Sequence, residues 1–225
     1  MTPSRAFSSH TARALLFVGL GLGSPLIASA VEIVRDNQTY QVLGTTRDEI
    51  LAGMRRLAPL NPATGEPRDA LTRWELDWRY DTRDGVQGCD IARVWTTLKV
   101  TTILPRHGAA STLPDDLRQE WTRILQRLTD HEEAHVRIAT DAAREVETSL
   151  DRLHRPNCAT IERDAREMGE TIVQRARARE RAYDTQSNYG KTEGANFRRA
   201  ETEGETSQLT GAEIRRLRAN PPAPR

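Results

Sequence analysis

The most constraining feature of this 225-residue chain is an apolar stripe at helical spacing between Leu117 and Leu153. Pro114, Asp115 and Asp116 precede the stripe, and this order favours a helix N-terminus. The members of the stripe are Leu117, Trp121, Ile124, Leu125, Leu128, His131, His135, Ile138, Ala142, Val146, Leu150 and Leu153. The pattern predicts one long amphipathic helix whose apolar face packs on a core.

Two histidines belong to that apolar face, within the sequence His131-Glu132-Glu133-Ala134-His135. On a helix, residues four apart point in nearly the same direction, so both rings can reach one metal ion. Glu132 then lies beside the ligands and can act as general base toward a metal-bound water. The motif predicts a Zn²⁺ site and favours a hydrolase, with a peptidase as the leading hypothesis.

The alternative is an ordinary amphipathic helix whose polar residues match the motif by chance. A single histidine on an apolar face is usually a core residue with a hydrogen-bond partner. Two buried imidazoles at this spacing are harder to explain in that way, because burial without partners is costly and one shared metal satisfies both rings. We therefore favour metal binding over coincidence.

The first thirty residues have the pattern of a secretory signal peptide. Arg5 and Arg13 supply a positive n-region, residues 14–22 form an apolar stretch, and Ala28-Ser29-Ala30 is a small-residue cleavage pattern. The alternative is an N-terminal membrane anchor, but the apolar stretch is short and rich in Gly. We expect cleavage after Ala30, a secreted or periplasmic location and no stable membrane span afterwards.

Charge and cysteine content narrow the function further. Removing two arginines and no acid from a chain of net charge +1 leaves −1, which gives no electrostatic case for nucleic acid as a partner. Cys89 and Cys158 are the two cysteines, and an exported protein favours pairing them in a disulfide. Two separate buried thiols are the alternative.

Segments rich in strand-forming residues precede the long helix. They cover 39–43, 74–80 and 89–104. A short helix is expected over 47–57, and a second long helix over 160–182 is expected to return antiparallel to the first. These elements predict an α+β fold: a small antiparallel sheet followed by the long H-E-x-x-H helix and a second antiparallel helix.

The chain therefore divides into three parts. Residues 1–30 form the predicted signal peptide and 31–197 a zincin-like metalloprotease domain. Gly, Thr, Glu, Arg and Pro dominate residues 198–225, so we expect a flexible polar C-terminal tail there.

A catalytic zinc site usually has three protein ligands, and the sequence leaves the third open. His107 precedes the long helix, and the returning helix brings Asp184 and Tyr189 toward the histidines. Phenolate can bind zinc, but its ordinary pKa of about 10 makes it a weaker ligand. The candidates are Tyr189, Asp184 and His107, and Tyr189 is also a candidate catalytic residue, as a transition-state donor.

Several motifs of this chain also occur together in one known family. They are Tyr40-Gln41-Val42-Leu43-Gly44-Thr45, Trp74, Trp78, Cys89, Leu104-Pro105, Trp121, the His131–His135 motif, Cys158 and the segment from Tyr183 to Ala195. The chain resembles, over most of residues 38–197, a bacterial domain family of unknown function whose members are predicted secreted zinc-dependent proteases. The resemblance implies zinc binding at His131 and His135 and a base role for Glu132. The family commonly has His-Gly where this chain has Tyr189-Gly190, and that His would be a natural third ligand.

The leading hypothesis is a secreted or periplasmic zinc-dependent peptidase acting on a peptide or protein substrate. In it, Glu132 activates a water on Zn²⁺ held by His131 and His135. One alternative is a catalytically inactive, zincin-like binding protein of the cell envelope, and another is a zinc amidase acting on cell-wall material. A third ligand within reach of the histidine pair would favour the catalytic hypotheses over the binding protein.

Overall fold

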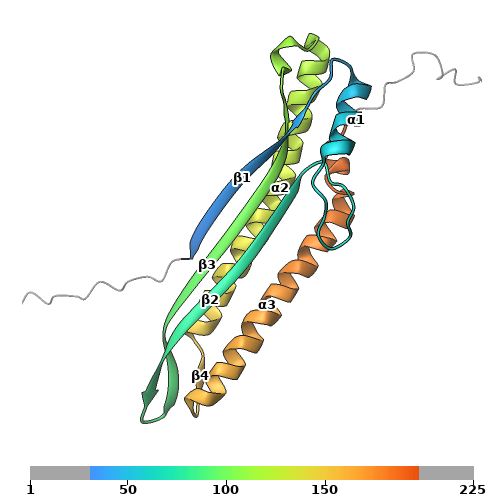
Figure 1. Ribbon diagram of the computed structural model, residues 1–225. Coiled ribbons are helices and arrows are strands. Elements are labelled where there is room, and N and C mark those ends of the chain that lie inside the picture. The colour runs from blue at the N-terminus through green and yellow to red at the C-terminus, as the bar shows by residue number, and fades with distance from the viewer. Residues whose placement is uncertain (1–30, 198–225) are drawn as a thin grey trace, which may run out of the picture.

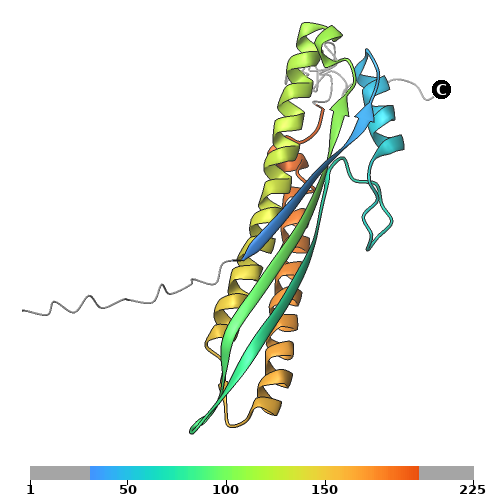
Figure 2. The ribbon, with the colours of Figure 1, turned by 60° about the vertical axis from the view of Figure 1, so that its left-hand side comes forward.

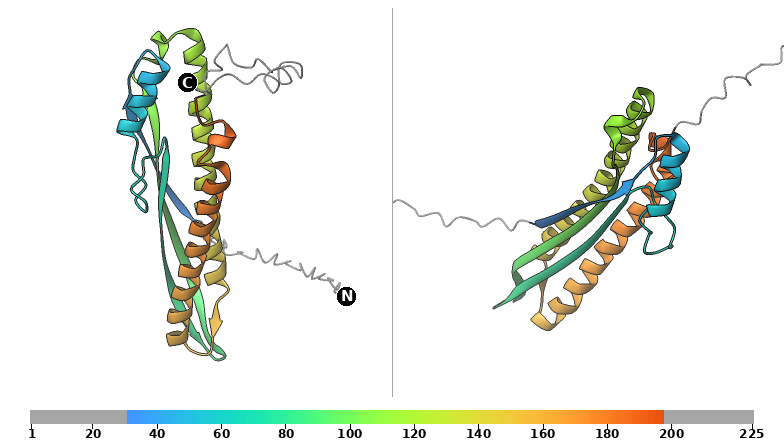
Figure 3. Two further views of the ribbon diagram at one scale, coloured as in Figure 1. Left: turned by 90° about the vertical axis from the view of Figure 1, so that its right-hand side faces the viewer. Right: turned by 45° about the horizontal axis from the view of Figure 1, so that its top comes forward.

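The computed structural model describes residues 31–197, so the predicted signal peptide and C-terminal tail lie outside the described residues. The fold is elongated and has two layers, with a sheet on one side and two long helices on the other (Figure 1, Figure 3). In chain order the elements are β1 (Glu32–Val42), α1 (Arg47–Leu57), β2 (Leu71–Gly85), β3 (Gly88–His107), η1 (Ala110–Thr112), α2 (Asp115–Asp151), β4 (His154–Arg155), α3 (Cys158–Ser187) and η2 (Lys191–Glu193).

The sheet is built around a long hairpin of β2 and β3, and its strand order is β1-β3-β2. Strands β2 and β3 pair antiparallel, and the two-residue β4 pairs with the start of β3. Strand β1 pairs with β3 in parallel, from Glu32 opposite Thr97 to Val42 opposite His107. The predicted α+β class is confirmed, but the sheet is mixed rather than wholly antiparallel. After β1 the chain turns through α1, runs back along β2 and returns along β3, so β1 and β3 run in the same direction.

Helix α2 spans 37 residues and buries most of the stripe that the sequence predicts, while Leu125 and Ile138 are half-buried and Leu153 follows the end of the helix. Helix α3 begins after Asn157, whose side chain accepts a hydrogen bond from the backbone N–H of Thr160 at 2.9 Å. The two helices run side by side in opposite directions along the long axis of the molecule (Figure 2), as expected for an antiparallel hairpin.

The helices cover one face of the sheet because β2 alternates in character along its length. Trp74 is buried, while its neighbours Arg73 and Glu75 are exposed on the other face. Helix α3 approaches β2 closely at Gly169, where an added Cβ would lie 2.3 Å from a ring carbon of Trp78. A glycine at this point allows the helix to pack against the indole.

The buried apolar residues form two clusters. One joins the hairpin to the second half of α2 and to α3, and the other joins α1 to the first half of α2. On α2, Leu128 belongs to the second cluster and Val136 to the first. The H-E-x-x-H motif therefore lies where the two clusters meet.

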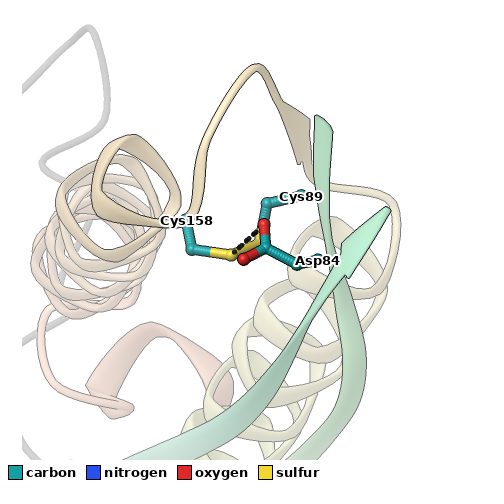
Figure 4. A group of neighbouring side chains, drawn as sticks. All are labelled: Asp84, Cys89 and Cys158. Carbon is teal, nitrogen blue, oxygen red and sulfur yellow. Dashed lines mark hydrogen bonds between the residues drawn. A yellow bond between two sulfur atoms is a disulfide. The ribbon is translucent and has the colours of Figure 1, made fainter. Parts of the chain in front are cut away.

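A disulfide joins Cys89, at the start of β3, to Cys158, at the start of α3, with the two Cα atoms 5.1 Å apart. Figure 4 shows the pair with Asp84, whose Oδ1 lies 3.2 Å from the sulfur of Cys158. The predicted pairing of the two cysteines is confirmed. Within residues 31–197, no helix has both the length and the apolar character needed to cross a bilayer.

Candidate metal centre

Three potential ligand atoms converge between the two long helices. The Nε2 atoms of His131 and His135 lie 3.3 Å apart, on successive turns of α2. Asp184, on α3, places its Oδ1 3.2 Å from His131 Nε2 and 3.0 Å from His135 Nε2. These three atoms form a group that could hold a metal ion. Of the three candidates for the third position, Asp184 is the one whose carboxylate lies next to both histidines.

The antiparallel return of α3 explains why Asp184 arrives at this point. Asp184 lies in the last turn of α3, and it meets α2 near the middle of that helix. Both histidine side chains are largely buried, with relative exposures of 5% and 9%, and that of Asp184 is 23% exposed. The cluster is therefore shielded on the α2 side and open on the α3 side.

Two more carboxylates lie behind the histidines. Glu193 Oε2 lies 3.1 Å from His131 Nδ1, and Glu180 Oε1 lies 3.5 Å from His135 Nδ1. Metal-binding histidines usually direct their second ring nitrogen to such an acceptor, which fixes the tautomer and the orientation of the ring. The arrangement leaves both Nε2 atoms facing the shared centre.

These outer carboxylates are themselves held in place. The indole N–H of Trp74 donates to Glu180 Oε1 at 2.7 Å, and Arg177 donates to Glu180 Oε2 at 3.2 Å. The hydroxyl of Tyr183 donates to both oxygens of Glu193, at 3.0 and 3.1 Å. The orientation of each histidine is thus supported through a second layer of side chains.

The ring of Tyr183 also packs on the centre. It stacks on His131 with ring centroids 4.8 Å apart. The chain then leaves α3 through left-handed backbone at Asn188, Tyr189 and Gly190. A Cβ at Gly190 would lie 3.2 Å from His131 Cγ, so this turn packs directly against the imidazole.

The protonation behaviour of the cluster reflects its crowded charges. Burial opposes the charged form of Asp184, but hydrogen bonds from both histidines lower its pKa to about 2. Burial likewise opposes the charged form of His135, but hydrogen bonds to Asp184 and Glu180 raise its pKa. The cluster therefore stabilises positive charge at its centre, as a cation-binding site must.

Glu132 is buried, with a relative exposure of 4%. Burial is the main cause that raises its pKa above the ordinary value for a glutamic acid. Its Oε2 atom has no hydrogen-bond partner among residues 31–197. A buried carboxylate oxygen without a partner is costly, so the site provides an acceptor for a group that enters from outside.

An open cleft of about 800 Å³ leads to the cluster. Its lining includes the two histidines, Glu132 and Asp184, together with Tyr189. The guanidinium of Arg68 lies over the ring of Tyr189, 3.9 Å from its centroid. Tyr189 therefore lines the same cleft as the proposed ligands.

His107 is held elsewhere. Its Nε2 lies 2.8 Å from the carbonyl oxygen of Gly44, and its Nδ1 accepts a hydrogen bond from the N–H of Ala109 at 3.1 Å. Its ring also packs against Trp121, ten residues before His131 and so about 15 Å away along α2. Because β3 extends past the centre before the chain turns into α2, His107 does not join the three ligand atoms as the sequence allowed.

Sequence reasoning missed Glu180 and Glu193. Glu180 precedes Asp184 by four residues, so the two carboxylates share one face of α3. That spacing is visible in the sequence and indicates that Glu180 lies on the same side of the helix as Asp184. Glu193 follows a left-handed turn after the helix, and no periodic pattern extends through such a turn.

Residues 37–191 match the model of the family described as "Bacterial protein of unknown function (DUF922)". The chain belongs to this family. The match covers the second half of β1, all of α1, β2, β3, α2, β4 and α3, and the three residues of the candidate centre. Searches of curated proteins and of solved structures find no significant match.

Proposed function

We propose that this protein is a zinc-dependent peptidase. The observation that carries the proposal is the combined site: His131, His135 and Asp184 converge, and the unpartnered carboxylate oxygen of Glu132 lies beside them. Three protein ligands next to a carboxylate base are typical of catalytic zinc sites.

The spacing of the ligand atoms supports zinc as the metal. Two ligands of a tetrahedral zinc ion with bonds of about 2.0–2.1 Å lie about 3.3 Å apart. The three separations here are 3.0, 3.2 and 3.3 Å. Two imidazoles and one carboxylate also match the ligand preferences of Zn²⁺, so the residues present fit the ion.

Zinc, when bound, supplies a Lewis acid that polarises a scissile carbonyl and acidifies water. The residues of the chain perform the rest of the reaction. Glu132 takes a proton from the attacking water and delivers it to the leaving amine. Burial raises the pKa of Glu132, which makes its carboxylate a stronger base toward that water. Glu180 and Glu193 keep the two imidazoles oriented.

Tyr189 remains the candidate donor to the transition state. It lines the cleft beside the centre, and 39% of its surface is exposed and so accessible to a substrate. With Asp184 available as third ligand, the phenol is free to donate a hydrogen bond to an oxyanion.

The proposal includes export. The disulfide between Cys89 and Cys158 supports an oxidising compartment, where such bonds form and persist. The N-terminal pattern of residues 1–30 is that of a signal peptide, which would direct the chain to the periplasm or the medium.

The test compares the zinc-loaded full chain with the Glu132→Gln variant on casein and on a peptide library. We expect stoichiometric zinc in both proteins and a loss of hydrolysis of about 100-fold or more in the variant, because a general base contributes about 10²–10⁴-fold. Metal content is measured by mass spectrometry and cleavage by peptide release.

The matched control is Glu133→Gln. Glu133 is the next residue along α2, but it is exposed and pairs with Arg35 at 2.9 Å, so its loss should leave hydrolysis unchanged. Zinc-loaded Glu132→Gln protein as active as the wild type would contradict the mechanism. A zinc-loaded wild type that cleaves nothing would contradict the enzymatic proposal.

A further inference from the structure

Charged side chains of both signs line the cleft beside the metal centre, with most of the acids at the centre and the bases along the remaining walls. The basic residues are Arg68, Arg73, Lys99, Arg177, Arg181 and Lys191. The acidic residues are Asp69, Glu75, Glu132, Glu180 and Asp184. Three of these acids, Glu132, Glu180 and Asp184, belong to the centre itself. The remaining walls of the cleft therefore carry an excess of positive charge.

Most of the cations already have partners. Arg177 pairs with Glu180 and donates to the backbone oxygen of Trp74 at 2.6 Å. Arg68 pairs with Glu66 at 2.7 Å, and Lys99 lies 4.0 Å from Asp77. Lys191 is close enough to Asp69 to oppose the effect of burial on the pKa of that acid.

Arg73 and Arg181 differ from these cations. Both side chains line the cleft, and neither forms an ion pair or a side-chain hydrogen bond within the described part of the chain, residues 31–197. Arg73 extends from the face of β2 opposite Trp74, and because β2 is an edge strand Arg73 lines the cleft at the edge of the sheet. Arg181 lies on α3, three residues before Asp184. Residues three apart share a face of a helix, so Arg181 is a neighbour of the proposed metal ligand.

We propose that these two arginines make the cleft selective for peptides that carry a carboxylate close to the bond that is cut. This inference rests on the proposed peptidase function. A guanidinium recognises a carboxylate through two parallel hydrogen bonds, which gives both affinity and orientation. Unpaired arginines near a site that binds a cation also repel basic substrates and attract acidic ones.

The carboxylate can come from an Asp or Glu side chain or from the C-terminus of the peptide. Both sources present the same group, so the experiment must separate them. The probes are fluorescent peptide pools of matched sequence, with acidic residues kept or all replaced by Asn and Gln. Each pool is made with a free or an amidated C-terminus.

The first measurement is binding of each pool to the zinc-loaded full chain carrying Glu132→Gln, followed by fluorescence anisotropy. We expect a pool that carries the recognised carboxylate to bind about 10-fold more tightly than the matched pool in which that carboxylate is replaced by an amide, since hydrogen bonds to charged groups contribute more than neutral ones. The preference should shrink at high salt. An advantage that follows the side chains, or one that follows the free C-terminus, identifies the source.

Adding Arg181→Gln or Arg73→Gln should bring the ratio of dissociation constants, between pools without and with the recognised carboxylate, toward one. The control is Arg179→Gln, which removes an exposed arginine that does not line the cleft, two residues from Arg181 on the same helix. The control should preserve the ratio.

Equal binding of all four pools, with no advantage from acidic side chains or from a free C-terminus, or no binding of any pool, would overturn the inference. So would cleavage by the wild type with no enrichment of acidic residues or C-termini near the cut, although the peptidase proposal would then stand. Selective binding of carboxylate-bearing pools without any cleavage by the zinc-loaded wild type would contradict the peptidase proposal but support carboxylate recognition.

Discussion

At the scale of single residues, the centre depends on one carboxylate that the motif does not contain. The two histidines lie one turn apart on α2, and Asp184 from α3 completes a triangle of ligand atoms. The exposed fraction of the Asp184 side chain is larger than that of either histidine. Asp184 is therefore the most exposed of the three residues that face the cleft.

Asp184→Ala should lower zinc affinity by more than about 100-fold, because even residues that only support a ligand contribute about 10–100-fold. A competition titration against a chromophoric chelator measures the change. Asp141→Ala is the control, since Asp141 lies on α2 with its side chain 62% exposed beside Arg144. Unchanged zinc affinity in the Asp184 variant would exclude that residue as a ligand.

Tyr189→Phe tests the other candidate residue. If the phenol donates to the transition state, kcat/KM should fall by about 100-fold while zinc affinity stays the same, as expected for the loss of one oxyanion donor. Peptide hydrolysis and the same chelator titration give the two quantities. A fall in zinc affinity would instead make Tyr189 a ligand, and an unchanged rate would remove it from the reaction.

At the scale of elements, the position of α3 decides the site, because α3 carries both Asp184 and Glu180. Its approach to the sheet depends on Gly169, where the Trp78 ring occupies the space that a side chain would need. The helix therefore packs against β2 at a distance set by one glycine.

Gly169→Ala should destabilise the fold by about 1–3 kcal/mol, since an added methyl group overpacks a filled interior. Alanine is the better helix former by about 1 kcal/mol, so the measured loss comes from packing and is partly offset. Urea denaturation measures the change. Arg179→Ala, at an exposed position of α3, is the control, and a Gly169 variant as stable as the wild type would contradict the close packing.

At the scale of the whole molecule, the disulfide and the candidate metal centre join different parts of the fold and lie far apart. The disulfide connects the starts of β3 and α3, at the end of the molecule where β4 pairs with β3. The centre lies farther along the helices, because Leu150, in the last turn of α2, is fifteen residues or about 22 Å from His135. Loss of the disulfide should therefore leave the geometry of the metal centre intact.

Replacing both cysteines with serine should lower the free energy of unfolding by about 2–4 kcal/mol, because the bridge closes a long loop of sequence separation 69. Zinc affinity of the folded variant should remain that of the wild type. Denaturation curves and a chelator titration check the two statements. A variant of unchanged stability, or one that folds but loses zinc binding, would contradict this separation.

The sequence alone predicted most of the elements and two of the three residues of the candidate metal centre. Helical periodicity identified α2 with both histidines on its buried face, because that spacing is a local property of the chain. Helical periodicity also predicted α1, strand-forming residues predicted parts of β2 and β3, and the expected export of the chain favoured the disulfide.

Only the tertiary structure decided what lies next to what. The parallel pairing of β1, the exclusion of His107 and the choice of Asp184 all depend on where distant segments meet, and no local pattern encodes that. The same holds for Glu180 and Glu193, which reach the histidines across the helix hairpin and around a left-handed turn. A metal centre is a set of long-range contacts, so its motif can be found in the sequence while its completion requires the fold.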